Sequence, residues 1–251
     1  MGWHVHSLLL LFHLHPLIFI LINIAVLVVN PQSPPRRYNS AYQQLQKMTF
    51  THTPTQLTLL WLAFSLPAVT WDFFYVIFRP HTMPGGSIHS PFWVPYALYG
   101  EVDGNYGWKQ WHAGSGFPAA QSWMNAIETA MYLVYAWIWW TSKDQVTGEI
   151  RGKRAAAAVL TGFAAGVMTE SKTVLYWLNE ICSGYENIGQ NDLFRLIVLW
   201  VVPNGLWLVF PATQFIYGFG KEIIDGLAGS ETEDGPTYSE VVKNGSEKKE
   251  L

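Results

Sequence analysis

Two carboxyl side chains interrupt apolar stretches that are long enough to cross a lipid bilayer. Asp72 lies in the stretch 57–78 and Glu128 in the stretch 121–140. Charged groups are costly inside hydrocarbon, so they usually face the interior of a helix bundle and mark a functional site. At a rise of 1.5 Å per residue, Asp72 lies roughly 9 Å from the end of its stretch, and Glu128 lies at a similar depth. The two carboxyls are therefore predicted to meet in one layer of a bundle.

Polar and aromatic side chains from two further stretches reach the same layer. Tyr176 and Glu180 approach it from the fourth stretch and Asn204 from the fifth. Spacings of three and four residues place side chains on one face of a helix. Three such faces are Asn125, Glu128, Tyr132, Tyr135 and Trp139; Trp200, Asn204, Trp207, Pro211 and Gln214; and Ser65, Ala68, Asp72, Tyr75 and Arg79. We therefore expect a cavity in which carboxyls lie among aromatic rings.

This combination of residues suits carbocation chemistry. A carboxyl in a low-dielectric pocket can stay protonated near neutral pH and act as a general acid. Once its proton reaches an alkene, aromatic faces and a second carboxylate stabilise the cation, and a base removes a proton elsewhere. The alternative is that Asp72 and Glu128 are buried acids that serve folding, through hydrogen bonds or a pair with Lys172, the one basic residue inside a stretch.

Other kinds of chemistry lack their residues. The chain has no phosphate-binding glycine loop, no nucleophile elbow, and no helical histidine pair with an adjacent acid. One cysteine allows neither a disulfide within the chain nor a thiolate zinc cluster, and the net charge of -3 argues against nucleic acid. The sequence therefore predicts neither a metal nor a cofactor. Histidines in the first stretch are interpreted as packed or interfacial: His4, His6, His13 and His15.

The elements that must position these residues are transmembrane helices. Half of the residues are hydrophobic and 13% are charged, against about a quarter charged in an average soluble chain. Five apolar stretches of near 20 residues each follow one another, at 8–29, 57–78, 121–140, 155–178 and 196–217. The predicted fold is an all-α integral membrane bundle of five transmembrane helices.

The segments between the stretches define the predicted domains and orientation. Residues 1–30 form an N-terminal transmembrane helix, 57–224 a four-helix membrane domain with a lumenal cap loop 79–120, and 225–251 a disordered tail. Within the cap loop, Tyr106 and Asp103 either close over the cavity or form a turn. Eleven of the 15 basic residues fall on one side of the predicted spans and three on the other, so the N-terminus is predicted to be lumenal and the C-terminus cytosolic. The last four residues, 248–251, resemble a dilysine retrieval signal, which indicates the endoplasmic reticulum membrane.

Two motifs carry a resemblance to a known family. Thr173-Val-Leu-Tyr-Trp-Leu-Asn-Glu180 is followed by Gly184-Tyr185 and by Val201-Val-Pro-Asn-Gly-Leu-Trp-Leu-Val-Phe-Pro211. Together with the Glu-Thr pair at 128–129 and with Asp103 and Tyr106, these residues resemble the emopamil-binding protein family, which has an EXPERA domain. The resemblance covers about residues 57–224.

The resemblance implies sites and a reaction. Founding members are sterol isomerases that move a double bond from position 8 to 7 by protonation and deprotonation. Glu128 matches their acid, Asn204 and Trp207 match polar and cation-facing residues, and Asp72 stands where they have a glutamate. Their histidine one turn earlier is Ala68 here, and a nearby threonine is Met131. The isomerase proton relay is therefore incomplete in this chain.

Three hypotheses for function follow. The first is a cofactor-independent terpene cyclase, similar to fungal members of the same scaffold that cyclise meroterpenoids by direct protonation. The second is a sterol Δ8-Δ7 isomerase, and the third a non-enzymatic sterol- or lipid-binding protein. Asp72 and Glu128 are the predicted catalytic residues. The predicted substrate-binding residues are Asn204, Trp207, Tyr176, Glu180, Tyr132 and Tyr106. The expected partners are a lipophilic isoprenoid or sterol and membrane lipid, without nucleic acid, and the oligomeric state is left open, a homodimer included.

Overall fold

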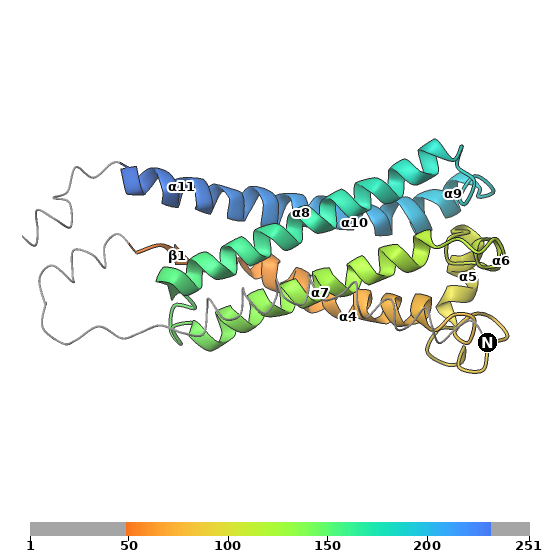
Figure 1. The fold of residues 1–251 in the computed structure, drawn as a ribbon, viewed down its shortest axis with the longest axis horizontal. Helices are drawn as coiled ribbons and strands as arrows, with labels where there is room; N and C mark the ends of the chain where they lie inside the picture. Colours follow the sequence, from red (N-terminus) through yellow and green to blue (C-terminus); the bar gives the residue numbers. More distant parts are fainter. Residues whose placement is uncertain (1–48, 232–251) are drawn as a thin grey trace, which may run out of the picture.

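Four long helical rods form one elongated bundle in the computed structural model, which describes residues 49–231 (Figure 1). The first three rods are α4 (Gln56–Ile77), α7 (Phe117–Ser142) and α8 (Gly152–Cys182). The fourth is built from α9 (Leu193–Leu196), η1 (Ile197–Val201), α10 (Val202–Phe210), η2 (Pro211–Phe219) and α11 (Gly220–Glu231). The predicted helical class is thus confirmed for this part of the chain. The predicted first span and its four histidines lie outside the described residues.

Two of these rods are long and apolar enough to cross a membrane. They are Gln56–Ile77 and Leu193–Gly229, within the part of the chain that the structure describes. Large apolar side chains also project outward from all four rods, among them Phe64, Trp140, Leu175 and Val209, each at least half exposed. Exposed apolar surface on this scale marks a surface that contacts lipid or a partner.

Local sequence signals explain where the helices begin and where their turns widen. The Thr55 hydroxyl accepts a hydrogen bond from the Thr58 amide and caps α4, and the Asp192 carboxylate does the same for the Arg195 amide at α9. In the last rod, Pro203 and Pro211 cannot donate to the helical ladder. The widened π-helical turns η1 and η2 adjoin or contain these two prolines. The last rod is therefore continuous but locally unwound.

Small residues let two rods approach closely. Gly162 and Gly166 on α8 face Phe219 and Phe215 on η2, and a Cβ added to Gly166 would lie 2.5 Å from the Cβ of Phe215. Glycines four residues apart allow this kind of contact between membrane helices. Phe215 and Phe219 are buried in the main core cluster together with Tyr135.

A short sheet and a buried histidine tie the end of the bundle opposite the cap. Strand β1 (Thr51–His52) pairs antiparallel with β2 (Ile150–Arg151), which the sequence did not predict. His52 is buried, with its Nδ1 2.7 Å from Glu222 Oε2 and its Nε2 2.9 Å from the Tyr135 hydroxyl. The chain before α4 is therefore held to α7 and α11. Helix α11 itself runs to Glu231, past residue 225, where the sequence places the start of the tail.

The segment predicted as a cap folds over the other end of the bundle (Figure 1). It contains α5 (Pro95–Val102) and α6 (Trp108–His112), and residues 117–120 belong to α7. The Tyr75 ring of α4 stacks on the Tyr96 ring of α5 with centroids 3.8 Å apart. Arg79 donates from Nη1 to the Asn105 carbonyl at 2.9 Å. The cap is thus an ordered part of the fold.

We expect Gly166→Ala to destabilise the bundle, because the new methyl group would overlap Phe215. Overpacking of this kind costs about 1–3 kcal/mol. Gly205→Ala in α10 is the matched control, since an added Cβ there meets nothing within 4 Å. Thermal unfolding in detergent should show a lower midpoint for Gly166→Ala alone. Equal midpoints for the two variants would contradict this account of the contact.

Candidate active site

A cavity of about 460 Å³ lies between the cap and the cap-facing halves of the rods. This volume falls within the range of small-molecule sites, about 300–1,000 Å³. Five of the predicted site residues line it: Asp72, Tyr106, Tyr176, Asn204 and Trp207. The cap supplies further rings, Tyr96 and Tyr99. The predicted cavity of aromatic rings around a carboxyl is therefore present.

Asp72 is held by three neutral donors. The Tyr96 hydroxyl donates to its Oδ1 at 2.8 Å. The Tyr106 hydroxyl and the Asn125 Nδ2 donate to its Oδ2 at 3.2 and 3.3 Å. Within residues 49–231 no basic side chain forms an ion pair with it. Asp72 therefore faces the cavity without a compensating positive charge in contact.

A lysine links Asn125 to the second predicted carboxyl. Lys172 Nζ donates to Asn125 Oδ1 and lies 3.6 Å from Glu128 Oε2. Because Oδ1 of Asn125 accepts from the ammonium, its amide nitrogen is directed at Asp72. Asp72, Asn125, Lys172 and Glu128 thus form one continuous polar chain across α4, α7 and α8.

Glu128 and Tyr132 do not line the cavity with Asp72, which differs from the sequence prediction. Asn125 is the residue of α7 that reaches Asp72, and Glu128 lies about one helical turn further along that helix. Glu128 is 3% exposed and lies behind Lys172 and Trp207, beside a separate small void. Tyr132 borders the same void, and its hydroxyl is 3.1 Å from Thr169 Oγ1. The prediction that Glu128 lies at a depth similar to that of Asp72 was wrong by about one helical turn.

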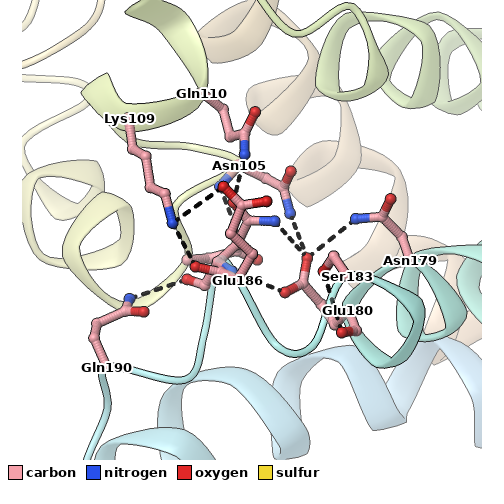
Figure 2. A network of polar contacts seen from close by, with 10 residues as sticks. Asn105, Lys109, Gln110, Asn179, Glu180, Ser183, Glu186 and Gln190 are labelled. Carbon is pink, nitrogen blue, oxygen red and sulfur yellow. Dashed lines mark hydrogen bonds and ion pairs between the residues drawn. The ribbon is translucent and has the colours of Figure 1, made fainter. Parts of the chain in front are cut away.

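Glu180 also lies outside the cavity, where it holds the cap. Its Oε1 accepts from the side-chain amides of Asn105, Asn179 and Asn187, and its Oε2 accepts from the Asn187 backbone amide. Figure 2 shows Glu180 and Asn105 pointing toward one another between the cap and the loop after α8. One turn separates Glu180 from Tyr176, which is enough to carry it past the cavity.

A carboxyl in the cap positions the tyrosine of α8. Asp103 Oδ2 accepts from the Tyr176 hydroxyl at 2.5 Å and from Trp200 Nε1 at 2.9 Å, and its Oδ1 accepts from the Asn105 amide. Burial raises the pKa of Asp103 to about 6, although these hydrogen bonds act in the opposite direction. Both alternatives for Asp103 are seen: its bonds to Tyr176 and Trp200 fasten the cap to the rods, and its bond to the Asn105 amide forms a turn within the cap.

Asn204 lines the cavity, and its side chain is held mainly by a hydrogen bond within its own rod. Its Nδ2 donates to the Trp200 carbonyl at 2.8 Å and lies 3.5 Å from the Tyr99 hydroxyl. The Trp200 carbonyl belongs to the widened turn η1, so the side chain supplies a donor where the ladder is irregular.

Sequence reasoning did not assign four residues that shape the site. These are Tyr96, Tyr99, Asn125 and Lys172. The signal for Lys172 was present, because it is the one basic residue inside a predicted span, and its pair with Glu128 was among the alternatives. The two tyrosines lie in the cap, where an irregular sequence gives no periodicity to read.

The cavity reaches the side of the bundle between α4 and the last rod. These two rods meet at η2 and Phe210, where the Trp61 ring stacks on the Phe210 ring with centroids 4.4 Å apart. Toward the cap they diverge, with α5 between them (Figure 1). Trp71 and Leu98 line the cavity there and are 39% and 46% exposed. Exposed apolar side chains of α4 and α5 therefore border the cavity at the side of the bundle.

No protein-family model, curated protein or solved structure matches this chain. Within residues 49–231, no three His, Cys, Asp or Glu side chains are grouped as a metal ion would require. The geometry of the site therefore carries the functional argument.

We expect Asp103→Asn to change how stability depends on pH. The folded pKa of about 6 exceeds the ordinary value of 3.8, so the folded protein holds this proton more tightly than the unfolded chain. The contribution of Asp103 to stability is then lost as the pH rises from about 4 to about 6. Between those pH values, the free energy of unfolding of the variant should improve relative to wild type by about 2–3 kcal/mol. A difference that does not change with pH would contradict the raised pKa.

Proposed function

We propose that this protein is a membrane enzyme that carries out proton-initiated carbocation chemistry on an isoprenoid, as a terpene or meroterpenoid cyclase. The observation that carries the proposal is Asp72, a carboxyl held by Tyr96, Tyr106 and Asn125 at the wall of an aromatic cavity. A site for such chemistry needs a positioned acid, a water-poor cavity and ring faces.

Asp72 is proposed as the proton donor. Its proton passes to an alkene carbon of the substrate, and the neighbouring carbon becomes a cation that an internal double bond attacks to close the ring. The rings of Tyr99, Tyr176 and Trp207 face the same space and would stabilise the positive charge. The carboxylate left on Asp72 then takes a proton from a carbon next to the final cation, which gives the product and restores the acid. The product has the mass of the substrate.

Glu128 is proposed as the carboxylate of the site. Lys172 Nζ lies 3.6 Å from Glu128 Oε2, and the two side chains form an ion pair. The pair also removes a problem for the reaction, because Lys172 lines the cavity and its uncompensated charge would oppose a developing cation. The negative charge of Glu128 offsets it. Asp72 and Glu128 thus have different roles although both are carboxyls.

Sterol Δ8-Δ7 isomerisation is the second candidate. Asp72, Asn204 and Trp207, matched to that family by resemblance, share one cavity here, which favours a related reaction. The position where those isomerases have a histidine is Ala68, which lines the cavity with a methyl group. A base for shifting the double bond is therefore lacking at that point, and cyclisation is ranked first. A non-enzymatic sterol- or lipid-binding role is the third candidate.

We further propose that the four rods and residues 1–30 make five transmembrane helices in the endoplasmic reticulum, with a lumenal N-terminus and a cytosolic C-terminus. Basic residues gather near the bundle end opposite the cap, where α7 ends and α8 and α11 begin, which suits a cytosolic surface (Figure 1). They are Lys143, Arg151, Lys153, Arg154 and Lys221. The outward apolar side chains suit lipid contact. Beside Trp71 and Leu98, the exposed residues at the edge of the cavity, a lipophilic substrate would enter directly from the bilayer.

The experiment that tests the function uses microsomes containing the protein. They are incubated with farnesylated phenolic substrates and with a Δ8-sterol, and the products are followed by mass spectrometry. A cyclised product of unchanged mass supports the cyclase. A Δ7-sterol would instead support the isomerase, and binding without conversion would support the third candidate.

Asp72→Asn is expected to remove the proton donor while keeping one acceptor oxygen, for either the Tyr96 or the Tyr106 hydroxyl, which donate to different oxygens of Asp72. General acid catalysis contributes about 10²–10⁴-fold to rates, so kcat should fall by at least about a hundredfold. The thermal midpoint of the variant should stay close to that of wild type. Full activity in this variant would remove Asp72 from the mechanism.

Glu128→Gln should also lower kcat strongly, because it leaves the Lys172 ammonium uncompensated beside the cation. The double variant Glu128→Gln/Lys172→Met removes both charges and is expected to regain most of the activity. Rates of the two single variants and the double variant form a thermodynamic cycle. A double variant as inactive as Glu128→Gln would contradict this role of charge compensation.

A further inference from the structure

A second, small void lies behind the cavity wall, deeper in the bundle. It has a volume of about 10 Å³ and is bordered by residues of α4, α7, α8 and α10. Val69 and Trp207 border both this void and the large cavity, so they form the wall between the two. A void needs about 10–15 Å³ of probe-occupied volume to hold one water molecule. The void is therefore of the size for a single water and too small for a substrate.

Two polar atoms that border the void have no hydrogen-bond partner among the described residues. They are the Ser65 hydroxyl oxygen and Glu128 Oε1. Ser65 is 4% exposed and Glu128 is 3% exposed, so bulk water does not reach them. An unpaired buried hydroxyl costs about 1–3 kcal/mol and an unpaired carboxylate oxygen more. Two such atoms facing one void indicate a bound ligand that can both donate and accept.

A third polar atom offers the void an acceptor. The Thr169 hydroxyl donates to the Ala165 carbonyl at 2.9 Å, so it has no proton left for its neighbour. The Tyr132 hydroxyl must therefore be the donor in its contact with Thr169 Oγ1. The Tyr132 oxygen keeps free lone pairs, and Tyr132 and Thr169 both border the void.

We propose that one ordered water molecule is bound in this void by Ser65, Glu128 and Tyr132. The water accepts a hydrogen bond from the Ser65 hydroxyl and donates its two protons to Glu128 Oε1 and the Tyr132 oxygen. Three hydrogen bonds match the usual number for a buried water. The Ser65 hydroxyl and Glu128 Oε1, the two unpaired buried atoms of the residues around the void, are then both satisfied, without any change in the helices.

The water gives Ser65 a positioning role. Through this water, Ser65 holds Glu128 Oε1 on the void side, so that Glu128 Oε2 stays directed at Lys172. The ion pair that compensates the lysine charge would therefore depend on a serine that touches neither the lysine nor the cavity. The binding of the water stands independently of the proposed function, whereas its effect on catalysis rests on that function.

Infrared difference spectroscopy of the full-length protein in H₂¹⁶O and H₂¹⁸O tests the water itself. A wild-type band of a strongly hydrogen-bonded internal water should shift with the isotope, and Ser65→Val, which fills the void, should lose it. Ser122→Ala is the matched control, because the Ser122 hydroxyl is also buried without a partner but borders neither cavity. That variant should keep the band. No isotope-sensitive band in wild type, or an unchanged band in Ser65→Val, would overturn the proposal.

The positioning role has its own test, with Ser65→Ala as a variant that keeps the void. A mutation far from the reacting atoms that misplaces a catalytic group can lower the rate up to about a hundredfold. We expect kcat of Ser65→Ala to fall by about 10- to 100-fold with an unchanged KM, while Ser122→Ala keeps both. An unchanged kcat in Ser65→Ala would overturn the positioning role. If wild type shows no activity on any tested substrate, the proposed function fails, but the isotope experiment still decides whether the water is bound.

Discussion

The need to compensate one partly buried ammonium organises the interior of this bundle. Lys172 lies among apolar and aromatic side chains, and a buried charge is tolerated there only when it is paired. Glu128 supplies the charge and Asn125 the hydrogen bond. Once the Asn125 carbonyl oxygen is bound to the lysine, its amide nitrogen is left for Asp72. The orientation of the carboxyl at the cavity thus follows from the pairing of a lysine two helices away.

The cap turns this polar chain into a site. Tyr96 and Tyr106 contribute two of the three donors to Asp72, and both come from the segment between α4 and α7. Their placement depends on ring stacking with Tyr75 and on two buried carboxyls, Asp103 and Glu180, which fasten the cap to the rods. Neither carboxyl takes part in the proposed chemistry. They serve the site by keeping the tyrosines at the cavity wall.

The last rod is packed tightly on one side and loosely on the other. Toward α8, Gly162 and Gly166 bring η2 into close contact through Phe215 and Phe219. Toward α4 the contacts are fewer and gather around Trp61, whose ring meets the rings of Phe210 and Trp207. Pro211 begins the widened turn η2, and Pro203 lies just after the widened turn η1. Close packing of the last rod against α8 and sparser packing against α4 fit a cavity that exchanges a lipophilic molecule with the bilayer.

The sequence by itself determined the helical class, the positions of the long rods, and the carboxyl, amide and ring types that gather in the cavity. These depend on apolar length and on helical spacing, which are local properties of the chain. It also predicted that Asp72, Tyr176, Asn204 and Trp207 would meet, because depth along each span and helical spacing direct them to one layer. Only the tertiary structure decided that Asn125 rather than Glu128 stands beside Asp72, that Glu180 fastens the cap, and that cap tyrosines bind the carboxyl. Those outcomes depend on the axial offset between helices and on the path of an irregular loop. Spacing within one helix contains no information about either, because both are set by contacts between segments far apart in the chain.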